Sequence, residues 1–261
     1  MPLPFAFSLD PATLAILALV AFIAGFIDAI AGGGGLLTIP ALLTAGLPPH
    51  LAMGTNKLCA TFGSATASYT FYRRKLFAPR QWRNALIGTA VGALLGAALA
   101  HWLPSAWLNQ MLPAVVFACG LYLLFGQTPA APLVADAPIG QGRQWPQGLG
   151  LGFYDGVAGP GTGAFWTVSS LLLYPLDLVR ASGVARSMNF VSNACALSVF
   201  IISGQVAWLL GISMGLALMV GAFLGARTAI KGGSKFIRPV FILVVLALTA
   251  RLAWQHWFGL A

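Results

Sequence analysis

Long apolar runs separated by short basic loops are the feature that most constrains the fold of this 261-residue chain. A helix that crosses the hydrocarbon core of a bilayer needs about 20 apolar residues. Runs close to that length occur at 12–31, 51–72, 84–103, 107–126, 182–203, 206–226 and 237–257. Only 7% of the residues are charged, whereas a soluble domain needs about a quarter to cover its surface. The sequence therefore predicts an all-α integral membrane protein and excludes a soluble domain.

The runs fall into two similar halves. Each half begins with apolar segments interrupted by glycines and continues with three spans, so that each holds about five segments. The shorter pieces are 36–46, 147–159 and 162–175. A Pro/Gly/Ala-rich stretch at 127–146 separates the halves and is typical of a linker. We expect residues 1–126 and 147–261 to form two transmembrane repeats joined by a cytoplasmic linker at 127–146.

The halves also match residue by residue. Residues 25–35 read GFIDAIAGGGG, and residues 152–162 read GFYDGVAGPGT, at a constant offset of 127. Further along, the segment that begins at Lys57 lies opposite the segment that contains Arg186. Each half thus carries an acid, a glycine cluster, and a basic residue near the start of its third segment. This agreement indicates an internal repeat.

Charge placement predicts that the two repeats have opposite orientations. Lys and Arg in short loops mark the cytoplasmic side. The expected loop after 72 holds Arg73, Arg74, Lys75, Arg80 and Arg83, and the one after 226 holds Arg227, Lys231, Lys235 and Arg238. With both loops inside, the glycine-broken hairpin of the first half enters from outside and that of the second half from inside. This is the inverted-repeat arrangement of secondary transporters, and it puts both termini outside the cytoplasm.

The glycine clusters predict two helix breaks that bind an anion. Each glycine in a helix interior costs about 1 kcal/mol relative to alanine, so 32–35 and 159–163 should be non-helical. Helices that restart at about Leu36 and Ala164 would point free N–H groups and a positive dipole end at the break. We expect the N–H groups of 33–36 and 161–164 to hold the anion near the bilayer midplane. The alternative is that the glycines only allow close helix packing.

Polar side chains near the breaks extend this candidate site. Thr38 and Thr162 offer hydroxyl groups. The third segments of the two halves contribute Asn56, Lys57, Arg186, Asn189, Ser192 and Asn193. We expect the two cations to set the charge selectivity of an anion pathway, one near each mouth. The alternative is that both side chains reach along the helix to the membrane surface, as long basic side chains do near helix ends.

Asp28 and Asp155 are acids inside apolar segments, where a carboxylate is costly and is usually functional. Three roles are open for each of them in coupling or gating. The carboxylate could cap the restarted helix, pair with Lys57 or Arg186 until substrate competes, or exchange protons during transport. The sequence alone does not decide between these roles.

Other classes of function find little support. His50, His101 and His256 are too scattered for a metal site, and we expect neither a metal nor a cofactor. The nucleophile motifs of membrane hydrolases are missing, so an enzyme is not expected. The net charge of +9 lies in loops and does not indicate nucleic acid. The expected partners are the lipid bilayer and a small anion, and a homodimer remains open.

The paired motifs resemble the TauE/SafE sulfite exporter family. The resemblance rests on GFIDAIAGGGGLLTIP at 25–40, GTNKL at 54–58, GFYDG at 152–156, GPGTG at 159–163 and NFVSN at 189–193. It covers essentially the whole chain and implies a bacterial inner-membrane exporter of sulfite, sulfoacetate or other organosulfonates. One departure concerns Arg186, because a Lys–Leu pair is expected there. Alternatives to a carrier are an uncoupled anion channel and a membrane subunit that does not transport.

Overall fold

The computed structural model describes residues 10–103 and 140–257, with the backbone alone at Arg238 and at 241–257. The expected span 107–126 and most of the expected linker lie outside these residues. Every regular element in the described part is a helix. The elements are α1 (Pro11–Ala31), α2 (Gly35–Thr44), α3 (Pro49–Arg73), α4 (Arg83–Trp102), the 3₁₀ turn η1 (Gln141–Arg143), α6 (Gln144–Val157), α7 (Thr162–Leu173), α8 (Leu178–Ile202) and α9 (Trp208–Trp257).

Several described helices can cross a membrane by length and composition. These are Pro11–Ala31, Arg83–Trp102, Leu178–Ile202 and Trp208–Ile237. Helix α3 has 25 residues but carries a polar stripe that includes Thr55, Asn56 and Lys57. These three side chains are buried because α3 lies between α8 and α9 in the interior of the bundle. The chain is an all-helical membrane protein, as the sequence predicts.

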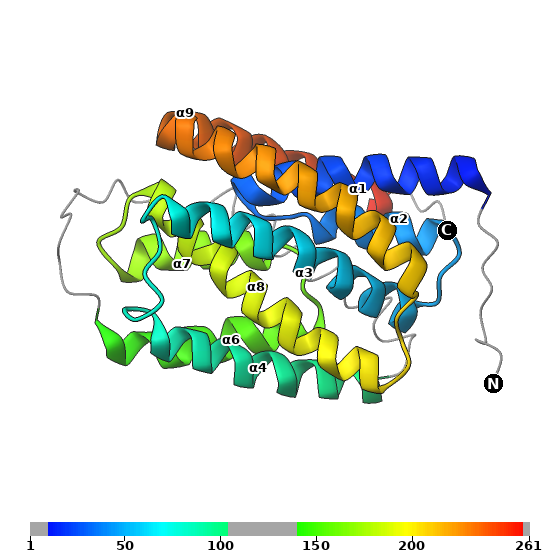
Figure 1. Cartoon of the computed structure of the whole chain (residues 1–261), viewed down its shortest axis with the longest axis horizontal. Coiled ribbons are helices and arrows are strands. Elements are labelled where there is room, and N and C mark those ends of the chain that lie inside the picture. The colour runs from blue at the N-terminus through cyan, green and yellow to red at the C-terminus, as the bar shows by residue number, and fades with distance from the viewer. Residues whose placement is uncertain (1–9, 104–139, 258–261) are drawn as a thin grey trace.

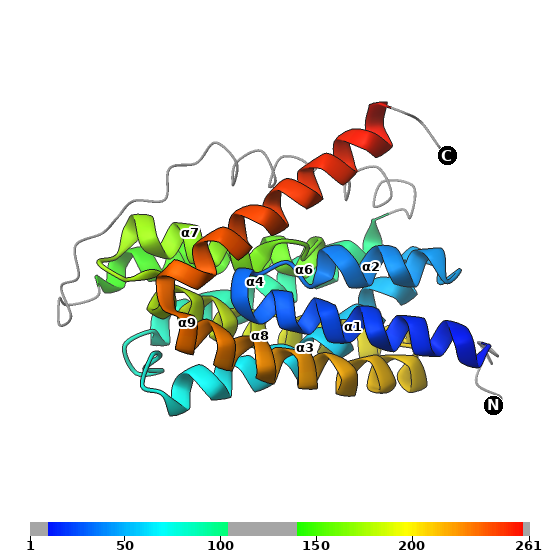
Figure 2. The same ribbon diagram turned by 90° about the horizontal axis from the view of Figure 1, so that it is seen from above.

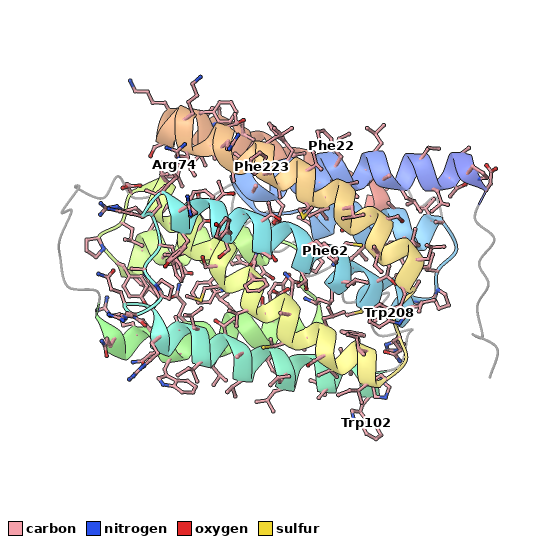
Figure 3. The ribbon with its side chains drawn as sticks, in the orientation of Figure 1. Phe22, Phe62, Arg74, Trp102, Trp208 and Phe223 are labelled. Carbon is pink, nitrogen blue, oxygen red and sulfur yellow. The ribbon has the colours of Figure 1, made fainter. Side chains whose placement is uncertain are left out.

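The helices of the two halves run in opposite directions along the long axis of the bundle (Figures 1 and 2). Helix α1 starts at one end and turns back near the middle as α2, whereas α6 starts at the other end and turns back as α7. Helices α3 and α8 are likewise opposed, and so are α4 and the part of α9 before Gly233. Figure 3 places Arg74 at one end of the bundle and Trp102 and Trp208 at the other.

Two seams of glycine join the halves. At each of Gly88, Gly92 and Gly96 on α4, an added Cβ would collide with backbone atoms of α6. The glycines Gly148, Gly152 and Gly156 on α6 meet the backbone of α4 in the same way. Helices α1 and α9 form the matching seam through Gly25, Gly221 and Gly225. Small residues let helix backbones approach closely, so each broken helix is packed onto a helix of the other half.

Helix α9 consists of two helical parts. Spans at 206–226 and 237–257 were expected with a basic loop between them, and Figure 2 shows that the chain reverses direction within α9. The backbone between the two parts is non-helical at Gly233, where φ is 62°. Long basic side chains are compatible with a helix, and the guanidinium of Arg227 lies 4.0 Å from the ring centre of Phe223, one turn earlier. The expected turn between the two spans is therefore present, but it is shorter than expected, because Arg227 and Lys231 belong to the helix before Gly233.

The broken hairpins differ slightly from expectation. Helix α1 has 21 residues and matches the spanning run expected at 12–31. The short helices begin at Gly35 and Thr162, a few residues earlier than the expected restarts at Leu36 and Ala164. Both breaks lie inside the bundle, where they can contribute to a site.

Candidate functional site

Both glycine clusters interrupt the helical backbone. The first break separates α1 from α2 between Ala31 and Gly35, and the second separates α6 from α7 between Val157 and Thr162. Gly32 and Gly159, which match at the repeat offset, have φ values of 77° and 85°. A residue with a side chain rarely adopts this left-handed region, so glycine allows the chain to turn at equivalent places in both halves.

Asp28 caps the first break. Its Oδ1 atom accepts hydrogen bonds from the N–H groups of Gly33 at 3.0 Å and of Gly34 at 2.9 Å. Its Oδ2 atom lies 3.5 Å from Nη1 of Arg186, and the main-chain oxygen of Asp28 also accepts a hydrogen bond from that nitrogen. The Asp28 side chain is 20% exposed. The carboxylate thus occupies the positive end of α2 while it pairs with a cation of the other half.

Asp155 makes a different set of contacts. Its Oδ1 atom lies 2.7 Å from Nζ of Lys57, and its Oδ2 atom accepts a hydrogen bond from the Ser192 hydroxyl. The Lys57 ammonium also donates to the main-chain oxygen of Asp155 at 2.6 Å and to Oδ1 of Asn193 at 3.2 Å. The Lys57 and Asp155 side chains are 2% and 3% exposed. Removing either partner would leave an uncompensated charge in the interior.

The two ion pairs cross between the halves. Lys57 of the first half pairs with Asp155 of the second, and Arg186 of the second half pairs with Asp28 of the first. An added Cβ at Gly32 or Gly163 would collide with the guanidinium of Arg186, so these glycines make room for it. The Nε and Nη2 atoms of Arg186 are buried, and neither has a hydrogen-bond partner in the described part of the chain.

A small polar cavity lies between the breaks. Its volume is about 30 Å³, enough for about two or three water molecules. The lining consists of Asp28, Gly33, Gly34, Gly35, Thr38, Asn56, Ala60, Asp155, Gly159, Gly161, Thr162, Gly163, Asn189, Asn193 and Leu218. Both breaks and both third segments contribute to it, so the wall is shared between the halves.

Each half presents a main-chain and a side-chain donor to this cavity. Within 10–103 and 140–257, the N–H groups of Gly35 and Gly163 have no hydrogen-bond acceptor. The same holds for the Nδ2 groups of Asn56 and Asn189, which face these two glycines. The Thr38 hydroxyl donates a hydrogen bond of 2.5 Å to Oδ1 of Asn56. Oδ1 of Asn189 is buried and has no hydrogen-bond partner among the described residues. The cavity therefore has four donors available for an acceptor-rich solute.

Comparison with known proteins identifies the family of the chain. The family model described as "Sulfite exporter TauE/SafE" matches residues 17–252. The chain belongs to the TauE/SafE sulfite exporter family. It is 40% identical over 251 residues to a "Probable membrane transporter protein" of Haemophilus influenzae, covering 94% of this chain and 96% of the relative. It is 37% identical over 265 residues to "Probable membrane transporter protein YfcA" of Escherichia coli K12, covering 97% of each.

A more distant relative is "Probable membrane transporter protein YdhB" of Bacillus subtilis. It is 25% identical over 220 residues, covering 81% of this chain and 89% of the relative. No solved structure matches the chain significantly. The family match and these names indicate a membrane transporter.

The residues singled out in the TauE/SafE motifs divide into two groups. Those on the cavity lining are Asp28, Gly33, Gly34, Gly35, Thr38, Asn56, Asp155, Gly161, Thr162, Gly163, Asn189 and Asn193. The others are off the lining: Leu36, Lys57, Arg186 and Ser192. Lys57 and Arg186 form ion pairs with the acids, and the Ser192 hydroxyl donates a hydrogen bond to Asp155. Lys57 and Arg186 were expected near the mouths of a pathway, but both are buried beside the breaks.

The sequence did not identify Ala60, Gly159 and Leu218 as lining residues. Gly159 could have been found, because it matches Gly32 at the repeat offset. Ala60 and Leu218 carry no polar signal, and only packing brings them to the cavity. In the described ranges, no three His, Cys, Asp or Glu side chains come together as a metal site requires.

Proposed function

We propose that this chain is a secondary transporter that exports small sulfur-containing anions, such as sulfite or organosulfonates, across the bacterial inner membrane. The observation that carries the proposal is the cavity between the breaks, with acceptor-free donors at Gly35, Asn56, Gly163 and Asn189. Sulfite and sulfonate groups present three oxygen atoms, which match such a set of donors. The family to which the chain belongs supports the choice of sulfur-containing anions.

The two halves then act as inverted repeats, corresponding to residues 1–126 and 147–261 on either side of the linker. The opposite directions of α1 and α6, of α3 and α8 and of α4 and the part of α9 before Gly233 support this proposal (Figures 1 and 2). The end of the bundle that carries Arg74 would be cytoplasmic and the chain termini extracytoplasmic. Alternating access would expose the cavity to one side and then to the other.

Asp28 is the candidate for proton coupling. Its carboxylate lines the cavity and holds the N–H groups of Gly33 and Gly34. Protonation would weaken both hydrogen bonds and give these two donors to the substrate, whereas Asp155 is fixed by Lys57 and Ser192. Transport by Asp28→Asn should therefore lose the pH dependence of the wild type. Unchanged pH dependence would remove Asp28 from the coupling step.

The test of the function is uptake into proteoliposomes that contain the full chain, with a panel of sulfite, organosulfonates and carboxylates. We expect saturable, counterflow-competent uptake of the sulfur-containing anions, because a carrier binds one solute per cycle. Asn189→Ala and Asn56→Ala should reduce uptake, whereas Asn84→Ala, outside this cavity, should not. Flux without saturation or counterflow would favour a channel. Anion flux unaffected by Lys57→Ala and Arg186→Ala would favour a subunit that does not transport.

A further inference from the structure

The charges around the cavity restrict the charge of the solute. Four charged side chains surround it: Lys57 and Arg186, and the carboxylates of Asp28 and Asp155. Each carboxylate only accepts hydrogen bonds, as an ionised carboxylate does. The donors are main-chain N–H groups, the lysine, the arginine and a hydroxyl. The two cations and the two carboxylates therefore cancel. The side chains alone provide no net positive charge for an anion.

The positive potential must come from the helix ends instead. Helices α2 and α7 begin at the cavity, and each helix N-terminus is equivalent to about half a positive charge. Together the two ends supply about one positive charge. A second observation points to a ligand at the end of α7: the Asn189 side chain is only 5% exposed, lines the cavity, and has a buried Oδ1 atom and an Nδ2 group without partners.

We infer that the cavity, while both carboxylates are ionised, selects monoanions and rejects dianions of the same shape. This inference rests on the proposed transport function and names the charge class of its substrate. A monoanion matches the charge of the two helix ends, whereas a dianion leaves about one unpaired negative charge in a dry interior. The small volume leaves no room for a layer of water that would screen the second charge. Sulfonates without a second acid group and hydrogen sulfite fit this class, whereas sulfate and sulfoacetate, which carry two negative charges at neutral pH, do not.

Two nearly isosteric anions test the inference with shape held constant. Methanesulfonate stays a monoanion, while methylphosphonate changes from monoanion to dianion near neutral pH. Binding to the purified full-length protein would be followed by thermal shift below and above that transition. We expect methanesulfonate to bind at both pH values and methylphosphonate to weaken about tenfold or more when it becomes a dianion. Sulfate should be as weak as the dianionic methylphosphonate.

Neutralising one acid of the cavity should relax the selectivity. Asp28→Asn and Asp155→Asn each remove one negative charge and so raise the net charge around the cavity by one. Sulfate affinity should therefore rise relative to methanesulfonate affinity in whichever variant folds. The matched control is Asp10→Asn, which changes the total charge equally at an exposed residue before α1 and should keep the wild-type preference. Equal or tighter binding of dianions by the wild type would overturn the inference and leave the transport function standing. Binding of none of these anions would overturn both.

Discussion

The two helix breaks share one sequence motif but use its acid differently. In the first break, Asp28 caps α2 through two N–H groups and stays partly exposed beside a loosely paired arginine. In the second, Asp155 leaves the start of α7 uncapped and is held by Lys57 and Ser192 in the interior. A repeated motif therefore produces one helix cap next to the cavity and one fixed ion pair. The first is suited to change during transport and the second to hold the halves together.

The largest expected effect on stability distinguishes the ion pair Lys57–Asp155 from the ion pair Arg186–Asp28. Lys57→Ala leaves the carboxylate of Asp155 buried and unpaired, which should cost about 3–5 kcal/mol of unfolding free energy. Arg186→Ala should cost less, because Asp28 keeps its two N–H donors and its partial exposure. Unfolding in detergent measures both values. The double variant Lys57→Ala/Asp155→Leu should recover much of the loss, and equal losses for both single variants would contradict the assigned difference.

The next effect compares a glycine at the start of α7 with one at the start of α2. A Cβ at Gly163 would overlap the Arg186 guanidinium and lie 2.7 Å from Nδ2 of Asn189, so Gly163→Ala should cost about 2 kcal/mol and abolish anion binding. At Gly35, an added Cβ would meet Nδ2 of Asn56 at 3.7 Å, which is an ordinary contact. Gly35→Ala is therefore the matched control and should fold as the wild type does. Thermal stability and anion binding are measured for Gly163→Ala and Gly35→Ala. An equal loss of stability and binding in the two variants would contradict the expected difference between the two glycines.

A smaller effect concerns the hydroxyl that holds Asp155. Ser192→Ala removes a hydrogen bond to a buried carboxylate and should cost about 1.5 kcal/mol. Ser198→Ala is a suitable control, because this serine lies on the same helix and donates only to a local main-chain oxygen. Thermal unfolding of the two variants gives the comparison. An equal effect at both serines would mean that Ser192 does not fix Asp155.

The smallest stability effect is expected at the cap. Asp28→Asn should cost about 1 kcal/mol, because an asparagine oxygen can still accept from the N–H groups of Gly33 and Gly34. Its effect on the pH dependence of transport should be large by comparison. Unfolding and transport assays on the same preparation separate the two. A loss of stability as large as that of Lys57→Ala would show that Asp28 is as firmly fixed as Asp155.

Much of the fold follows from local sequence. Apolar runs gave α1, α3, α4 and α8 to within a few residues, and glycine clusters gave both breaks, because these signals depend on short stretches of chain. The basic residues of 227–238 correctly indicated a turn between two helices but not its exact place, since cations of that spacing occur both in loops and on helix surfaces. Arg227 packs against Phe223 in the helix before Gly233, and this contact has no local signature.

The site was predictable in its parts but not in its pairing. The lining glycines and asparagines belong to motifs that the sequence shows twice. The roles of Asp28 and Asp155 depend on which cation of the opposite half reaches each break, and that is set by the packing of α3 against α8. Leu218 reaches the cavity from α9, and an apolar residue among many carries no sign of such a position.

The glycine seams have a consequence for biosynthesis. Helix α1 emerges from the ribosome early, but the surface that matches Gly25 belongs to α9 and is made nearly two hundred residues later. The surface of α1 around Gly25 therefore faces lipid until α9 has been synthesised. Two separately expressed halves should accordingly be degraded when made alone and accumulate only when produced together in one cell.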